Sequence, residues 1–292
     1  MQGTVDGFDY GVATPLVGYV MACLGGALGL RCVARSLLVT RVRRAAWLAL
    51  GSVAIGSGIW TMHFIAMMGF SVDGTPLRFD GPMTWASLGL AVVMVGVGIF
   101  IVGYRGTDRT SLVTGGTITG LGVASMHYLG MAAVRFGGHF TYNTLTVAAS
   151  VVIAVAAATT ALWAAGRVRG LAGSVGASLV LGLAVTGMHY TGMAALGVHL
   201  HHTAHTVPPG APAEDLVPIL VGPLALLLLA GVVVVFDPLM VKGGRPRPAA
   251  ESKPGVPAAT IPSHQHLRPP YRPGRQPVGH AGAQGSRAPH GH

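Results

Sequence analysis

The stretch Gly187-Met188-His189-Tyr190-Thr191-Gly192-Met193 determines how this sequence is interpreted, because its pattern occurs three times. Met126-His127-Tyr128-Leu129-Gly130-Met131 is the second copy, and Met62-His63-Phe64-Ile65-Ala66-Met67 is the third. Each copy reads Met-His-x-x-x-Met inside a long uncharged apolar run, and the histidines are 64 and 62 residues apart. Self-similarity at a nearly fixed spacing predicts a repeated architecture in which every unit carries the same candidate site.

The composition indicates a protein of the lipid bilayer. Of the 292 residues, 51% are hydrophobic and only 10% are charged, whereas a soluble domain is about a quarter charged. The net charge of +10 comes from short connections and the C-terminal stretch. Because no basic helix face is interleaved with aromatic residues, we expect no binding of nucleic acid.

Seven segments are long and apolar enough to span a bilayer, which takes about 20 residues of helix. The sequence therefore predicts an all-α membrane domain of seven transmembrane helices over residues 10–236. The remainder, 237–292, is rich in Pro, Gly, Arg and His without periodicity, and we expect a disordered basic tail. The predicted spans are 15–30, 46–70, 83–103, 112–134, 145–165, 175–198 and 216–236.

The connections between the spans predict the orientation. Nine arginines fall in connections on one side and two on the other, and basic residues mark the cytoplasmic side. We therefore expect the N-terminus outside and the C-terminus in the cytoplasm. The arginines on the expected inner side are Arg31, Arg35, Arg41, Arg43, Arg44, Arg105, Arg109, Arg167 and Arg169; those outside are Arg78 and Arg135.

The second, fourth and sixth spans carry the motif and run outward. Their histidines lie at matching places, in the outer half of the membrane. Three two-helix hairpins in the same sense predict parallel repeats about a pseudo-threefold axis along the membrane normal, plus one further helix. Small residues flank every copy, and we expect them to allow close helix packing rather than to bind a ligand. They are Gly56, Gly58, Ala66, Gly120, Gly122, Gly130, Gly182, Ala184 and Gly192.

The motif side chains suit a soft metal ion. Neutral imidazole and thioether are copper ligands, and thioether selects Cu(I) over harder ions. The histidine and second methionine of each copy are four residues apart and share a helix face. No carboxylate accompanies them, as a proton relay would require, and zinc more often takes cysteine or carboxylate with histidine. The candidate ligands are Met62, His63, Met67, Met126, His127, Met131, Met188, His189 and Met193.

Other interpretations of the same residues stay open. A single buried histidine often serves as a hydrogen-bonding group between helices, and a methionine often fills a gap in the core; three copies at one depth favour a functional site. The aromatic residues Phe64, Tyr128 and Tyr190 orient the imidazoles, stack on a ligand or anchor the helices at the membrane surface. A histidine-rich outer connection either captures metal ions or is simply polar; its histidines are His199, His201, His202 and His205.

At these residues the chain resembles the MHYT-domain family of bacterial integral membrane proteins, named for the four residues that stand complete at 188–191. The resemblance covers about residues 10–236. It implies a sensory input domain of the bacterial plasma membrane whose motif methionines and histidines hold a metal, with copper proposed. That metal is thought to sense a diatomic gas such as O₂, CO or NO. The first copy departs from the motif at Phe64 and Ile65, and the second at Leu129.

The leading hypothesis is thus a membrane sensor of gas or redox state. Many relatives attach cytosolic domains that make or degrade cyclic di-GMP; the stretch after Phe236 has no domain-sized apolar pattern, so we expect a separate cytosolic signalling partner. One alternative is copper transport or delivery, for which Met21, Cys23 and Met94 are the candidate inner ligands. Another is a metal-free receptor-like or scaffolding bundle. We expect no enzyme, because no catalytic constellation stands at membrane depth.

Overall fold

The computed structural model describes residues 5–6, 11–72, 75–167, 170–200 and 212–237, and within them it contains the seven expected helices. The stretch 238–292, expected to be a disordered tail, lies outside the described residues. The helices are α1 (Ala13–Ser36), α2 (Arg41–Met68), α3 (Gly81–Arg105), α4 (Arg109–Ala132), α5 (Thr144–Arg167), α6 (Gly170–Met193) and α7 (Pro212–Val235).

Several predicted helix ends were wrong. α1 continues six residues beyond 30, and α2 starts at Arg41, so arginines assigned to connections lie in terminal helical turns instead. Apolar counting stopped at these charges, although a charged side chain at a helix end can reach the polar surface. α6 spans 170–193 rather than 175–198, because the apolar residues after Met193 form a strand. Hydropathy alone does not distinguish the two.

The protein is a multi-pass membrane protein. Six of the seven helices are long and apolar enough to cross a membrane; the exception is α4. That helix is rich in glycine and threonine, and its glycines face neighbouring helices: a Cβ on Gly120 would clash with the backbone of Val155 in α5. Large apolar side chains elsewhere point outward, Leu183 and Leu228 among them, as expected for surfaces in contact with lipid.

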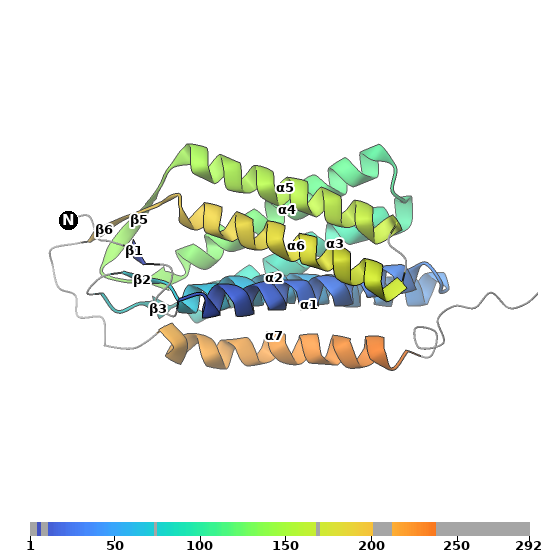
Figure 1. Ribbon diagram of the computed structural model, residues 1–292, viewed down its shortest axis with the longest axis horizontal. Helices are drawn as coiled ribbons and strands as arrows, with labels where there is room; N and C mark the ends of the chain where they lie inside the picture. The colour runs from blue at the N-terminus through green and yellow to red at the C-terminus, as the bar shows by residue number, and fades with distance from the viewer. Residues whose placement is uncertain (1–4, 7–10, 73–74, 168–169, 201–211, 238–292) are drawn as a thin grey trace, which may run out of the picture. The chain divides into compact units, whose positions relative to one another are not determined.

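Each hairpin is closed by a small antiparallel sheet that the sequence did not predict. The strand before the first helix of a hairpin pairs with the strand after its second helix, so the unit is strand–helix–helix–strand, three times over. The sheets gather at the end of the bundle where α2, α4 and α6 finish (Figure 1). The pairs are β1 (Val5–Asp6) with β2 (Ser71–Val72), β3 (Arg78–Phe79) with β4 (Val134–Arg135), and β5 (Gly138–Tyr142) with β6 (Leu196–Leu200).

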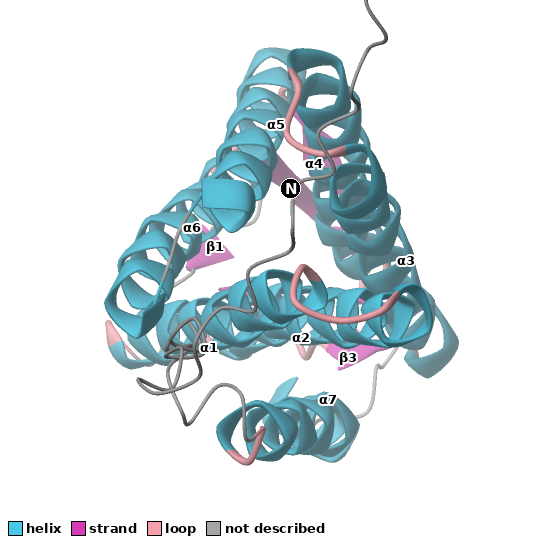
Figure 2. Ribbon diagram, turned by 90° about the vertical axis from the view of Figure 1, so that its right-hand side faces the viewer, coloured by secondary structure: helices cyan, strands magenta, loops and turns pink. Residues whose placement is uncertain are grey.

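The six repeat helices form a closed ring. Along the ring each helix packs on the next, and α6 returns to α1. Seen end-on, the hairpins α1–α2, α3–α4 and α5–α6 make three sides of a triangle, with α7 outside it beside α1 and α2 (Figure 2). This is the arrangement that a threefold repeat of parallel hairpins predicts, with the additional helix on one side only.

The small residues pack helices as expected, and in a repeated pattern. Gly56 of α2 meets Val92 of α3, Gly120 of α4 meets α5, and Gly182 of α6 meets Cys23 of α1. Every motif helix thus uses the equivalent glycine against the next hairpin in the ring. Close backbone approach of this kind is how transmembrane helices associate without a hydrophobic driving force between them.

Candidate metal centre

The repeat places one histidine on each motif helix at the same level. His63, His127 and His189 lie five, five and four residues before the last residues of α2, α4 and α6. Since all three helices finish at the same end of the bundle, the equivalent positions share a depth. The shared histidine depth inferred from the spacing of the motif therefore appears in the structure, on one helix from each hairpin.

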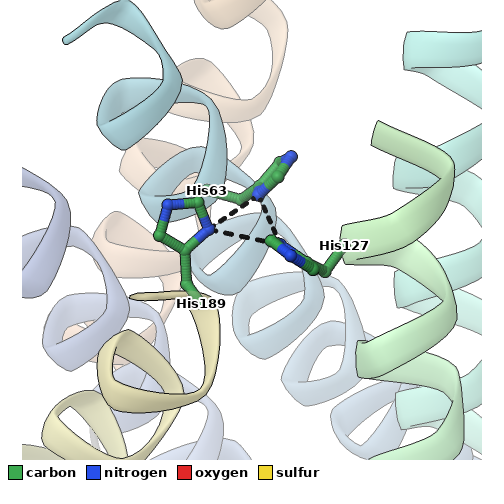
Figure 3. Close-up of side chains that lie close together, drawn as sticks. All are labelled: His63, His127 and His189. Atoms are coloured by element: carbon green, nitrogen blue, oxygen red, sulfur yellow. Dashed lines mark hydrogen bonds between the residues drawn. The ribbon is translucent and has the colours of Figure 1, made fainter. Parts of the chain in front are cut away.

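The three imidazoles meet inside the ring of helices (Figure 3). Their Nδ1 atoms lie 3.1 Å apart between His63 and His189, and 3.2 Å apart for the other two pairs. The side chains are fully buried, with at most 1% of each residue exposed. Three nitrogen atoms from three helices thus form a nearly equilateral triangle, and together they are the candidate metal-binding group among the described residues.

This triangle has the chemistry of a cation site. A neutral imidazole carries one N–H and one lone pair, so three converging Nδ1 atoms cannot all donate to one another. If all three present lone pairs, a cation at the centre satisfies them together. The centre of a triangle with these sides lies about 1.8 Å from each corner, and zinc–imidazole distances are about 2.0–2.1 Å. An outward shift of a few tenths of an ångström would accommodate a metal ion.

On the side of the rings away from the triangle, two of the Nε2 atoms lack hydrogen-bond partners in the described part of the chain. The Nε2 atoms of His63 and His127 are buried and have no hydrogen-bond partner among the described residues. A Cβ built on Gly130 would lie 2.5 Å from the Nε2 of His63, and Gly192 stands in the same relation to His127. These imidazoles are therefore oriented by the fit of the ring against a glycine, whereas metal-bound histidines usually donate to an acceptor.

An aromatic ring touches each imidazole edge-on. The centroid distances are 4.6 Å for His63 and Phe64, 4.8 Å for His127 and Tyr128, and 4.9 Å for the third pair, with Tyr190. The hydroxyl of Tyr128 also lies 2.7 Å from that of Ser150 in α5, which joins two hairpins beside the site. The structure therefore favours the orienting role that the sequence left open for these aromatic residues.

The six motif methionines lie in the same packed core as the triad. Five are at most 1% exposed and Met193 is partly buried. Met62 packs against Gly18 of α1, where a Cβ would lie 3.4 Å from its Cγ. Burial of this kind is also what a purely packing role requires, so the histidines alone define the centre. The methionines stay predicted ligands.

The outer histidines are only partly described. His199 lies in β6 opposite His139 of β5, with the two rings stacked 5.3 Å apart at 15°. Sequence reasoning missed His139, because the cross-strand pairing that brings it there was not predicted. His201, His202 and His205 lie outside the described residues.

A buried triad of imidazoles, one from each hairpin of a closed helical ring, defines a membrane protein whose three repeats together build one candidate metal centre. Comparison with known families agrees on the internal repeat: residues 56–115 and 120–178 each match the MHYT model, described as the bacterial signalling protein N-terminal repeat. The chain therefore belongs to the MHYT family. The two matches include His63 and His127, and the third copy of the motif lies beyond them.

The chain is similar to parts of larger signalling proteins. It is 38% identical over 181 residues to the bifunctional diguanylate cyclase/cyclic di-GMP phosphodiesterase MucR of Pseudomonas aeruginosa, covering 60% of this chain and 26% of that one. It is 35% identical over 227 residues to the cyclic di-GMP phosphodiesterase NbdA of the same organism, covering 73% and 28%. The chain thus spans about a quarter of the length of these relatives. No solved structure matches it.

Proposed function

We propose that this domain is a sensory input module that binds one metal ion at His63, His127 and His189, and that this ion is copper. The observation that carries the proposal is the convergence of three buried Nδ1 atoms to within 3.2 Å of one another. Helices from all three hairpins contribute, so occupancy of the site would bear directly on how the hairpins pack.

The surroundings favour a singly charged ion. Among the described residues, the fully buried charged side chains are Arg35 and Asp237, which pair with each other near the opposite ends of the helices. Three neutral imidazoles leave the charge of a bound ion uncompensated, and the cost of burying charge rises steeply with its magnitude. Cu(I) minimises that cost, and Met67, Met131 and Met193 would add the thioether ligands that favour it.

The sensing role follows from the position of the site. When bound, the metal would offer a coordination position to a diatomic ligand such as O₂, CO or NO, or respond to redox state. The protein's own residues hold the three nitrogens together and exclude water. A ligand can shift a conformational equilibrium only if it favours one state over the other; a site shared by three hairpins meets that condition whenever coordination changes their spacing. We propose that a separate cytosolic signalling partner reads this change.

The test is the metal content of protein purified without added metal. We expect about one copper per chain in the parent and none after the triple substitution His63→Ala, His127→Ala and His189→Ala. The matched control is His139→Ala, which removes an exposed imidazole outside the helices and should retain the metal. Full occupancy in the triple variant, or a parent that takes up no copper when copper is supplied, would contradict the proposal and leave a metal-free bundle.

A further inference from the structure

A cavity of about 40 Å³ lies inside the helical ring next to the triad. Ile59, Val123 and Val185 line it, and each stands four residues before one of the triad histidines. The cavity therefore begins about one helical turn from the imidazoles, roughly 6 Å along the axis. Met188, the residue before His189, also lines it.

The cavity exists because one helix has small side chains. Every helix of the ring contributes to the lining, and α1, α2 and α3 present only leucine, valine and isoleucine to it. α5 instead presents a row of alanines, so the space that larger side chains fill elsewhere stays open. These alanines are Ala154, Ala157, Ala158, Ala161 and Ala165.

The lining selects what can occupy this space. It is aliphatic apart from Met188 and Thr119, and the Thr119 hydroxyl lies 3.5 Å from the carbonyl oxygen of Met94. A buried water needs two to four polar partners, and apolar cavities of sufficient size stay dry and take up apolar guests. Since about 10–15 Å³ holds one water on this scale, a cavity of about 40 Å³ has room for about three atoms of that size. A lipid chain or an organic metabolite is too large.

A groove on the lipid-facing side of the ring reaches some of the same residues. This groove lies between α5 and α6, is lined mainly by small and aliphatic side chains together with Trp163, and shares Ala157, Ala161 and Leu181 with the cavity. The groove borders exposed apolar residues such as Val180, which face hydrocarbon in a spanning helix. Small apolar molecules dissolve better in hydrocarbon than in water, so this side of the ring is where they would enter.

We propose that the cavity is a binding site for a small uncharged apolar molecule of two or three atoms, entering from the lipid between α5 and α6. Binding depends on the shape and apolarity of the cavity alone. Its role, to hold such a molecule one helical turn from the metal, rests on the proposed function. An ion, in contrast, would find only the Met188 thioether beside the triad and the Thr119 hydroxyl, because the rest of the lining is aliphatic.

Xenon, which is apolar and of suitable size, is the probe. In crystals of the full chain under xenon pressure, we expect an anomalous peak within the ring beside Ala158. Ala158→Leu fills the space and should abolish the peak, and the smaller Ala158→Val should weaken it. Ala149→Leu enlarges an exposed alanine of the same helix away from the cavity and should leave the peak intact.

The metal content of the same variants separates this inference from the proposed function. Ala158→Leu should lose xenon and keep copper, whereas the triple histidine-to-alanine variant should lose copper and keep xenon. Absence of the peak in the parent, or an equal peak in parent and Ala158→Val, would overturn the cavity site whatever the copper content. A parent that binds xenon but no copper would overturn only the metal proposal.

Discussion

Gly130 and Gly192 leave room for the rings of His63 and His127, and this space allows the imidazoles to meet. Because a Cβ on Gly192 would occupy the position of the His127 ring, we expect Gly192→Ala to displace that imidazole. Copper affinity should fall about 10- to 100-fold, the usual effect of losing support around a metal ligand. Copper titration of the purified variant measures this.

Gly187→Ala on the same helix is the matched control, since a Cβ there meets nothing within 4 Å. It should keep the parent's copper affinity and gain about 0.5–1 kcal/mol of stability, because alanine is the better helix residue. Equal copper binding by the two alanine variants would show that the fit against Gly192 does not orient His127.

The histidines of the site could be predicted from the sequence, but the reason for these glycines could not. Three nearly equally spaced histidines in uncharged runs can be recognised in the sequence, and the repeat predicts that they lie close together. Gly130 and Gly192 also fit the ordinary packing pattern of membrane helices. Only the structure shows that each lies against the histidine of another hairpin. The first copy has Ala66 at this position, so the three units are not equivalent.

A carboxylate at the start of α4 supplies a pH-dependent contribution outside the membrane. Asp108 caps this helix, and hydrogen bonds from the Ser111 side chain and backbone N–H hold the pKa of Asp108 below its ordinary value. Its stabilisation is therefore present above about pH 4 and is lost as the pH falls through the lowered folded-state pKa. Asp108→Asn keeps a capping acceptor but does not titrate.

We expect the parent to unfold at a higher temperature than Asp108→Asn at pH 6, because the charge also favours the helix N-terminus. This difference should shrink as the pH falls below about 4, and it should disappear once the pH is low enough to protonate the aspartate in the folded state as well. Thermal unfolding followed by circular dichroism across this range tests the expectation. A difference that stayed constant down to pH 3 would mean that the charge of Asp108 contributes nothing.

Among the elements, α7 stands outside the repeat and is attached at both ends. Near its first turn, Asp215 accepts a hydrogen bond from the Phe79 backbone N–H and lies 3.5 Å from Arg78. Just beyond its last turn, Asp237 forms a buried ion pair with Arg35 at the end of α1. Breaking a buried pair by removing one partner leaves an uncompensated charge, which costs about 3–5 kcal/mol.

Arg35→Ala should therefore lower the free energy of unfolding by about that amount, as measured by thermal or denaturant unfolding in detergent. The control is Arg135→Ala, which removes an exposed pair with Asp80 and should cost about 0.2–1 kcal/mol. Arg35→Met combined with Asp237→Leu should recover much of the loss, because apolar packing can replace a buried pair. Equal losses for the two single variants would mean that the buried pair does not fix α7.

The elements themselves were predictable to different degrees. Long uncharged runs identified all seven helices, since each has more than 20 residues in the structure. The strands have two to five residues each, and they pair segments separated by an entire helical hairpin. Such short segments carry no alternating pattern that could reveal them. The end of α6 was misplaced for the same reason, because β6 continues its apolar run.

At the scale of the whole molecule, the ring encloses an apolar cavity, and the three imidazoles of the triad lie at one end of it. Below the triad and the adjoining Met188, the lining is aliphatic apart from Thr119, and the candidate inner ligands Met21, Cys23 and Met94 are not part of it. An ion moving inward from Met188 would therefore meet no further imidazole, thiol or thioether in this lining. The described interior therefore favours a metal that stays at the triad over one that is transported through the ring.

The first hairpin differs from the other two in how it connects to its surroundings. From His63 a chain of packed aromatic rings runs through Phe64 and Trp60 to Trp85, at centroid distances of 4.6, 4.5 and 6.2 Å. Trp85 in turn packs against Gly222 of α7, where a Cβ would lie 3.1 Å from the indole. A contiguous packed route therefore joins this one imidazole to the helix outside the repeat, and such chains of packed side chains are one way in which coupling between distant sites is carried.

A bound ion should hold the three hairpins together at the triad end, since without it three nitrogen lone pairs face one another across 3.1–3.2 Å. A ligand at 100 times its dissociation constant stabilises the folded state by about 2.7 kcal/mol. Protein supplied with Cu(I) should therefore unfold at a higher temperature than protein stripped by a Cu(I) chelator.

Hydrogen exchange should locate the same effect. Backbone amides near the ends of α2, α4 and α6 should exchange hydrogen faster in the stripped form, because the hairpins separate there first. Gly187→Ala should behave like the parent, and the triple histidine-to-alanine variant should show no effect of copper. If the parent melts and exchanges hydrogen identically with and without copper, the triad does not couple the hairpins through a metal.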